Sequence, residues 1–449
     1  MTMIQEPIVP ASPLKIGLAL SGGGYRAAAF HLGTLNKLDE LKILSKVDVL
    51  STISGGSITG AAWCLHDGDY PSFHKGMRQN LEQKNVLRYI YRSPTFIKAI
   101  SFAALFLLGA FYLTFTAWSC ASFFVLAIFF VLVFKYQYHI FPVSRVIENA
   151  YDDFFFNGKK LSDFNPEKPT IAIGSSNLHT GRPFTFSQTK MSDSGYAYGF
   201  EPPIRFKHGL FPIARAVMAS SCVPFAFSPV FIDRDFYENP SDADRVRPTL
   251  VDGGVYDNQG IQKLTQPKSS YECDIIITSD AGGNFKADKK YPNVIALLVR
   301  TVDLFMYRIK SSQMQQNVYR NVHGAAKPIA YFSLGWKLDG LIPGFVNNLI
   351  AGQVLKEVVD AHGFDPAWLA APKQYAAQIQ GHLEERTDYN AIIKRDLTND
   401  EWLLAKNVGT NLKSLSQLET ACLIRQAENL TELQIKLYCP LLLSQSLSL

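Results

Sequence analysis

The stretch 15–33 reads KIGLALSGGGYRAAAFHLG. Its apolar start predicts a short buried strand that ends at Ser21, and the residues after the three glycines predict a helix. Consecutive glycines allow backbone N–H groups to converge on an anion at a helix N-terminus. A dinucleotide fingerprint needs a glycine where Ala27 stands, and no G-K-[ST] sequence follows, so the pattern disfavours nucleotide binding.

Three further apolar runs lead into glycine-containing turns in the same way: VDVLSTISGG, PTIAIGSSN and DIIITSDAGG. Short apolar strands that alternate with helical stretches predict a mostly parallel sheet with helices on both faces, a three-layer α/β fold. In such sheets, ligands bind beyond the carboxyl ends of the strands, where each of these turns falls. Strand signals fade after about residue 286, so we expect residues 286–449 to form a helical C-terminal part.

The composition excludes several classes of protein. With 449 residues, 47% hydrophobic and only 18% charged, the chain is neither disordered nor a disulfide-stapled miniprotein. A net charge of +5 suits an anionic membrane surface and is too small for a dedicated nucleic-acid binder. The six cysteines form no C-x-x-C pair, so we expect a reducing compartment, no metal and no cofactor.

Residues 99–134 contain no charged side chain and consist mainly of Phe, Leu, Ala and Val. One straight helix of this length would reach roughly 54 Å, beyond the hydrocarbon slab of about 30 Å. Small polar residues near Ser119 suggest a break there, which predicts two short spans or a re-entrant hairpin. The alternative is a hairpin wholly buried in the protein core.

Lysines and arginines flank this hydrophobic run on both sides, from Lys75 to Lys98 before it and at Lys135 and Arg145 after it. This distribution places both ends, and with them the α/β domain, on the cytoplasmic face. The basic and aromatic stretch NVLRYIYRSPTFIK is typical either of a segment lying on anionic lipid or of an ordinary amphipathic helix packed on the domain.

A candidate nucleophile lies in VDVLSTISGGSITGAAW. Ser54 follows a strand and precedes a helix that begins with small residues, the arrangement that exposes a serine hydroxyl on a sharp turn. The usual pattern is G-x-S-x-G, and Thr52 replaces its first glycine. A helix N-cap serine is the alternative role for Ser54, and Ser57 is the rival nucleophile.

A candidate base lies in PTLVDGGVYDNQG, where Asp252 ends an apolar strand and two glycines follow. A carboxylate at this place can take a proton from a serine, or can simply form a turn. Asp280, in SDAGGN, is a similar carboxylate at a strand end and the competing base.

Together these three patterns, in this order, resemble the patatin-like phospholipase family. The likeness covers about residues 15–285 apart from an insertion at about 66–160, with 1–14 as an extended tail. It implies a three-layer sandwich and a lipid acyl hydrolase, of phospholipase A or lysophospholipase type, acting on membrane phospholipid. It also implies a Ser–Asp dyad and an oxyanion loop, formed by Ser54, Asp252, Gly22, Gly23 and Gly24.

Other residues bear on this hypothesis. No histidine lies in a motif that pairs it with the serine, and we interpret His31 as a satisfied histidine of the first helix. Arg26 is a candidate for holding a lipid phosphate or supporting the oxyanion, or forms a structural ion pair. The alternatives to hydrolysis are a non-catalytic membrane protein that binds lipid or acts as a scaffold, and an acyltransferase that uses the same site.

Overall fold

The computed structural model describes residues 14–283, 291–319 and 326–443. The expected tail 1–14 lies outside these residues except for Leu14. A nine-stranded sheet forms the centre. Five of its strands run parallel, in the order β3 (Thr170–Asn177), β2 (Val49–Ile53), β1 (Ile16–Leu20), β8 (Ile275–Asp280) and β9 (Ile329–Ser333). The others are antiparallel: β4 (Arg182–Phe186), β5 (Met191–Asp193), β6 (Val230–Phe231) and β7 (Thr249–Asp252).

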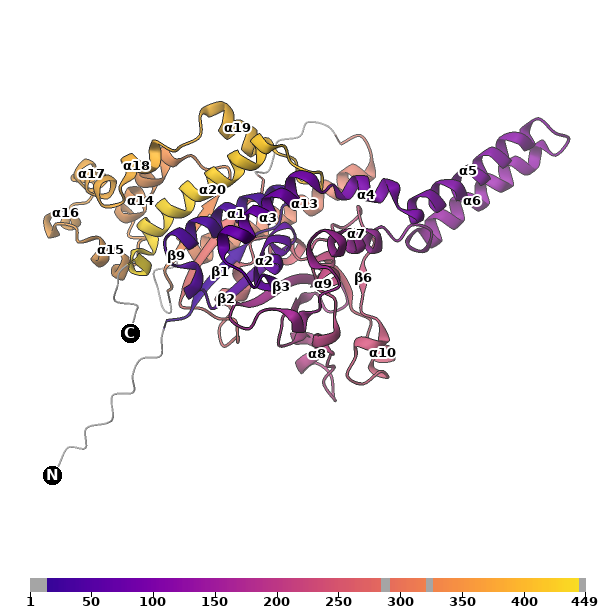
Figure 1. Ribbon diagram of the computed structural model, residues 1–449, viewed down its shortest axis with the longest axis horizontal. Coiled ribbons are helices and arrows are strands. Elements are labelled where there is room, and N and C mark those ends of the chain that lie inside the picture. Colours follow the sequence, from indigo (N-terminus) through magenta and orange to yellow (C-terminus); the bar gives the residue numbers. More distant parts are fainter. Residues whose placement is uncertain (1–13, 284–290, 320–325, 444–449) are drawn as a thin grey trace, which may run out of the picture.

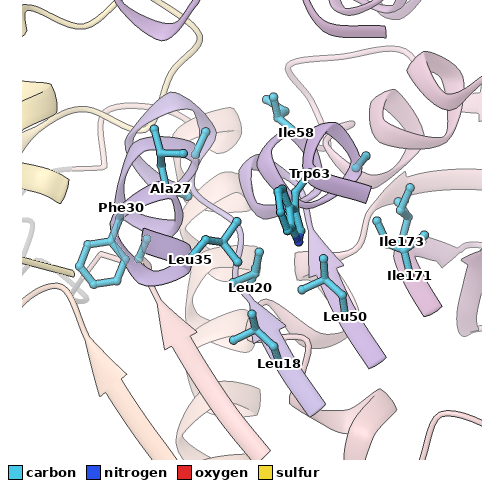
Figure 2. Close-up of a cluster of buried hydrophobic side chains, with 14 of the residues drawn as sticks. Leu18, Leu20, Ala27, Phe30, Leu35, Leu50, Ile58, Trp63, Ile171 and Ile173 are labelled. Atoms are coloured by element: carbon cyan, nitrogen blue, oxygen red, sulfur yellow. The ribbon is translucent and has the colours of Figure 1, made fainter. Parts of the chain in front are cut away.

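One face of the sheet carries a thick hydrophobic core. Helices α1 (Gly24–Glu40) and α2 (Gly55–Leu65) follow β1 and β2 directly and lie over the strands. Figure 2 shows their side chains meeting those of the sheet, among them Leu18, Leu20, Ala27, Phe30, Leu35, Leu50, Ile58, Trp63, Ile171 and Ile173. The opposite face has a smaller cluster around Ile276, Ile261 and Leu264, the last two from α12 (Ile261–Thr265). The expected three-layer α/β fold with a mostly parallel sheet is confirmed.

The insertion contains two long apolar helices that pack against each other, α5 (Pro94–Thr114) and α6 (Ser119–Ile140). Figure 1 shows this α5–α6 hairpin projecting away from the body of the protein. The chain turns between Thr114 and Ser119, where the sequence suggested a break. At 21 and 22 residues the helices extend past the uncharged run at its outer ends, and each is about 32 Å long.

Both ends of the hairpin return to the same body. Before it lie α3 (Tyr70–Gln83) and α4 (Val86–Arg92), and α7 (Val143–Tyr151) follows it. Helix α4 packs against α7, which in turn packs against α9 (Ile213–Ser220). Few hairpin residues are buried: the apolar windows of the two helices have mean hydropathies of 2.0 and 2.1 and are each 6% buried. A wholly buried core hairpin is therefore excluded.

The C-terminal part is largely helical, as expected, but it also adds the edge strand β9, which the sequence pattern did not predict. Its longest helix, α20 (Gln417–Tyr438), packs along α1. Gly33 of α1 lies at this contact, where an added Cβ would come 2.3 Å from the Ile424 carbonyl oxygen. The C-terminal part thus completes the core rather than standing apart from it.

The remaining helices connect these elements. They are α8 (Ser194–Tyr198), α10 (Asp242–Arg245), α11 (Gly254–Asp257), α13 (Val294–Met314), α14 (Leu341–Ile350), α15 (Lys356–His362), α16 (Pro366–Ala370), α17 (Ala376–Arg386), α18 (Tyr389–Ile393) and α19 (Asn399–Asn407).

Candidate active site

Ser54 stands on the sharp turn between β2 and α2. Its backbone has φ 50° and ψ −117°, a conformation that side-chain-bearing residues rarely adopt. The Ser54 N–H donates a hydrogen bond of 2.9 Å to Ser220 Oγ at the end of α9. The strained turn is therefore held by a contact from a distant helix, and Ser54 remains 7% exposed.

Small residues after Ser54 are required by close backbone contacts. A Cβ on Gly55 would lie 2.1 Å from the Gly24 carbonyl oxygen, and one on Gly56 would lie 2.4 Å from that of Leu20. Thr52, which departs from the usual motif, is accommodated because Gly60 faces it: a Cβ there would lie 2.6 Å from Thr52 Cγ2. The first turn of α2 can thus approach both β1 and the glycine loop.

Strand β3 brings Asp252 to Ser54. Along one edge of β3, Ile53 of β2 pairs with Gly174. Asp252 of the antiparallel strand β7 pairs with the next residue, Ser175. Strands β2 and β7 therefore meet end to end against β3, and the residues at their meeting ends become neighbours.

The carboxyl group of Asp252 is buried and hydrogen bonded. Burial raises the pKa of Asp252 to about 6, although hydrogen bonds with the Gly254 N–H and the Ser54 side chain lower it. The Gly254 N–H to Asp252 Oδ1 distance is 2.7 Å. A carboxylate in hydrogen-bond contact with a serine and with a pKa near neutrality is suited to accept a proton from that serine.

The glycine loop lies beside the two residues. The Gly22 N–H already donates a hydrogen bond of 3.0 Å to the Asn258 carbonyl oxygen. Gly23 and Gly24 have φ of 148° and 61°, which glycine tolerates best. Within the part of the chain that the structure describes, no acceptor is found for their N–H groups. Of these two residues, Gly23 lines the cavity beside the loop and Gly24 does not, so the Gly23 amide is the one available to a ligand there.

A cavity of about 480 Å³ opens over this loop and contains Ser54 and Asp252 in its wall. Its other walls come from the loop after α9, from α13 and from residues that follow β8. They are largely apolar, with Val223, Phe225, Val302 and Met306 among them. The size and lining suit a ligand with a hydrocarbon chain.

The competing candidates have other partners. Ser57 is fully buried, and its hydroxyl bonds to Thr52 Oγ1 and Ser220 Oγ. His31 lies in the core against Ser279 Oγ and the Ser21 carbonyl oxygen, and burial lowers its pKa to about 4. It is the satisfied helix histidine that the sequence suggested.

Asp280, the competing base, forms an ion pair with Lys310 of α13. Burial opposes its ionisation, but the Lys310 ammonium and hydrogen bonds from Lys310, Tyr331 and Gly282 outweigh burial and lower the pKa of this carboxyl. Asp280 is therefore a weaker base than Asp252.

Arg26 lies at the third position of α1 and lines the cavity. Its Nη1 donates a hydrogen bond of 3.1 Å to the Val408 carbonyl oxygen. Its Nε is buried and has no hydrogen-bond partner among the described residues. Burial lowers the pKa of this guanidinium, and Asp280 partly offsets that effect. No described residue forms an ion pair with Arg26, so the structural ion pair considered as its alternative role is not found.

Three residues of the site were not among the site residues predicted from the sequence. Ser220 holds the turn of Ser54, Asn258 occupies the Gly22 amide, and Lys310 neutralises Asp280. Asn258 lies in the stretch PTLVDGGVYDNQG, but nothing in that stretch indicates its contact with Gly22, and all three contacts depend on the tertiary fold. In the described ranges, no group of three or more His, Cys, Asp or Glu side chains is arranged as metal ligands.

Comparison with known proteins agrees with this architecture. The fold is similar to that of the human GIVD cytosolic phospholipase A2, with a TM-score of 0.50 and 15% identity. The match covers 97% of this chain and 60% of that enzyme, so the chain spans about three fifths of its relative's length. VipD from Legionella pneumophila is also matched, at 13% identity and a TM-score of 0.31, over 95% of this chain and 86% of VipD.

Comparison with curated protein sequences gives no match. The sequence profile described as patatin-like phospholipase, however, matches residues 18–264. This range contains the glycine loop, the turn of Ser54 and the strand that ends at Asp252. The order of these elements, their placement around one cavity and the matching profile lead to the same conclusion: the chain belongs to the patatin-like phospholipase family.

Proposed function

We propose that the protein is a membrane-associated lipid acyl hydrolase that uses Ser54 and Asp252 as a catalytic dyad. The observation that carries the proposal is the hydrogen bond between the Ser54 side chain and a buried carboxyl whose pKa is about 6. At neutral pH most of this carboxyl is ionised and ready to accept a proton. Membership of the family and the mostly apolar cavity support a lipid ester as substrate.

In the proposed reaction, Ser54 Oγ attacks the ester carbonyl carbon while Asp252 takes the hydroxyl proton. The N–H group of Gly23, which lines the cavity, stabilises the negative charge that develops on the carbonyl oxygen and lowers the activation barrier by about 3–4 kcal/mol. The C–O bond then breaks, and the departing alkoxide takes the proton back from Asp252. Water, activated by Asp252, attacks the acyl-enzyme and releases the fatty acid and the serine.

No histidine is needed in this scheme. Among the described residues, no histidine lines the cavity. His31 is buried in the core, where Ser279 and Ser21 hold both of its ring nitrogens. The same carboxyl therefore serves as base in both half-reactions.

The substrate class follows from the charges in the cavity. Arg26 brings a buried guanidinium with an unpartnered Nε to the wall that also holds the glycine loop. An Arg placed there binds a phosphate oxygen, whereas a neutral acylglycerol offers it no charge. We therefore propose a phospholipid or lysophospholipid rather than a neutral lipid, with Arg26 on the phosphate.

The α5–α6 hairpin is proposed to insert into the bilayer. Both helices are long enough to cross it, and only one residue of each is buried, Ala110 in α5 and Ser122 in α6. Because α4 and α7 pack against each other at its base, the chain must leave and re-enter on one side. The basic residues around this base favour the cytoplasmic side.

Fatty-acid release from mixed phospholipid micelles tests the proposal. The purified wild type should release fatty acid, and Ser54→Ala should reduce the rate at least a thousandfold. Ser162→Ala, on an exposed serine bonded to Gly209, is the matched control and should retain the wild-type rate. Equal release from wild type and Ser54→Ala would refute a serine hydrolase, and an acylated acceptor in place of fatty acid would indicate acyl transfer.

A further inference from the structure

Helix α13 exposes a row of large apolar side chains. None of its residues is buried. Leu298, Leu304 and Phe305 are 50%, 49% and 59% exposed, and Leu297 is 52% exposed. At helical spacing these four residues share one face, which is where a water-exposed helix normally carries its charges.

The charged residues of α13 are instead found mostly on its other side. Arg300, Asp303 and Lys310 all line the cavity, together with Val302 and Met306. The remaining charged residue, Arg308, is exposed and follows the apolar row by one turn. The helix thus turns most of its charged residues, mixed with apolar ones, toward the site, and its apolar row toward the surroundings.

A second apolar segment borders the same cavity. The loop that follows α9 presents Val223 and Phe225, which are 42% and 63% exposed. Phe225 has φ 67°, a left-handed conformation that is rare for a large aromatic residue. We call Leu297, Leu298, Leu304, Phe305, Val223 and Phe225 together the apolar rim.

The base of the α5–α6 hairpin is tied to the segments that border the cavity. At the start of α7, the Ser144 N–H and hydroxyl bond to Ser228, three residues after Phe225. At the start of α4, the Val86 N–H donates a hydrogen bond of 3.1 Å to the carbonyl oxygen of Leu412. Leu412 lies two residues after Thr410, which lines the cavity. An inserted hairpin would therefore bring the cavity mouth close to the membrane.

We propose that the apolar rim docks on the surface of a phospholipid bilayer, so that an acyl chain passes from the membrane into the cavity without crossing water. This inference rests on the proposed function. The occupant is lipid rather than a second copy of the chain, because a protein seated on the rim would cover the entrance that the substrate needs. Arg308, at the end of the apolar row, is placed to reach lipid phosphates while the row is immersed.

Fluorescence quenching in membranes tests the docking directly. Cys120 is the one exposed cysteine and the other five are buried, so Cys120→Ser gives a background in which a new surface cysteine is labelled alone. Phe305→Cys and Leu298→Cys, each carrying an NBD fluorophore, are reconstituted in vesicles of phosphatidylcholine and phosphatidylglycerol with brominated acyl chains. We expect bromine to quench both labels by at least half.

Leu418→Cys is the matched control, since Leu418 is 57% exposed on α20 and lies outside the rim. Its label should be quenched little. Quenching at Phe305 no stronger than at Leu418 would overturn the proposal. Disulfide cross-linking between two copies at Phe305→Cys, with no quenching, would overturn it in favour of a dimer interface.

Enzyme kinetics give a second test. The double variant Leu298→Glu and Phe305→Glu should lower the ratio of vesicle to soluble-ester turnover at least tenfold, and Leu418→Glu should leave this ratio unchanged. An unchanged ratio in the double variant would contradict docking through the rim. If the labels at Phe305→Cys and Leu298→Cys were quenched but the wild type released no fatty acid, only the proposed function would be refuted. If the labels were not quenched but the wild type released fatty acid, only docking through the apolar rim would be refuted.

Discussion

Lys310 and Asp280 form an ion pair beside the cavity, with 2.6 Å between Nζ and Oδ2. Asp280 also accepts hydrogen bonds from the Tyr331 hydroxyl and the Gly282 N–H. Asp252, at the end of another strand of the same sheet, pairs with no cation among the described residues. The two carboxyl groups therefore differ in chemistry: the charge of Asp280 is balanced by Lys310 and its pKa is lowered, whereas burial raises the pKa of Asp252, which we propose as the base.

Asp280→Asn should destabilise the fold without removing the nucleophile. The Lys310 ammonium, which is mostly buried, would lose its counter-charge, and we expect the free energy of unfolding at pH 7.5 to fall by about 3 kcal/mol. Because the pKa of Asp280 is lowered in the folded state, its stabilisation is present at neutral pH and is lost on acidification. Urea unfolding in detergent should show the gap between wild type and variant narrowing below about pH 4. An unfolding curve identical to that of the wild type at pH 7.5 would contradict the role of the pair.

The pH dependence of ester hydrolysis should report Asp252. Only its ionised form accepts the Ser54 proton, so kcat/KM for a soluble short-chain ester should rise with pH, with a midpoint near the Asp252 pKa of about 6, and then level off. His31, with a pKa of about 4, stays neutral throughout this rise. A profile that is flat between pH 5 and pH 8 would be inconsistent with Asp252 as the base.

Gly23→Ala should slow turnover more than it weakens binding. The residue has φ 148°, and an added Cβ would lie 3.1 Å from Ala27 Cβ, so the substitution displaces the amides of Gly23 and Gly24. We expect kcat to fall about a hundredfold with KM little changed, as for loss of an oxyanion donor. Gly283→Ala is the control, because it lines the same cavity and its Cβ would come no closer than 3.8 Å to a described neighbour. Similar effects of the two substitutions would argue against the loop as oxyanion hole.

Removing residues 99–134 should separate membrane binding from catalysis. The rings of Phe102 and Phe129 lie 6.1 Å apart across the hairpin, so the helices run side by side and Lys98 and Lys135 can be rejoined at its base by a short glycine linker. The variant should move from the membrane pellet to the supernatant while still hydrolysing the soluble ester. Loss of both membrane binding and ester hydrolysis would contradict the proposal that the hairpin serves the membrane alone.

The glycine-rich turns made much of this architecture predictable. The strand before Ser54, the tight helix start after it and the strand that ends at Asp252 each carry a local pattern of apolar and small residues. Their meeting is not local, because it depends on the one-residue step between Ile53 and Asp252 along β3. No local sequence pattern indicates that Ser54 and Asp252 lie close together. Without the structure, this proximity is implied only by the resemblance to the family.

Features that depend on distant packing could not be predicted in this way. A glycine such as Gly33 is unfavourable inside a helix, and nothing in the sequence explains it. The reason is the close approach of the Ile424 carbonyl of α20, which leaves no room for a Cβ at this position. Strand β9 follows a long helical stretch, so the sequence around it does not indicate a strand. Its position at the edge of the sheet is set by its pairing with β8. Engagement of the Gly22 amide by Asn258 is a contact between loops that have no shared pattern.

The central claim is that Asp252 activates Ser54, and covalent labelling with an alkyl fluorophosphonate tests it most directly. Intact-mass and peptide analysis should find one adduct on Ser54 in the wild type, and Asp252→Asn should slow its formation at least a hundredfold at pH 7.5. Labelling of Asp252→Asn at the wild-type rate, or an adduct on Ser57 instead of Ser54, would contradict the claim.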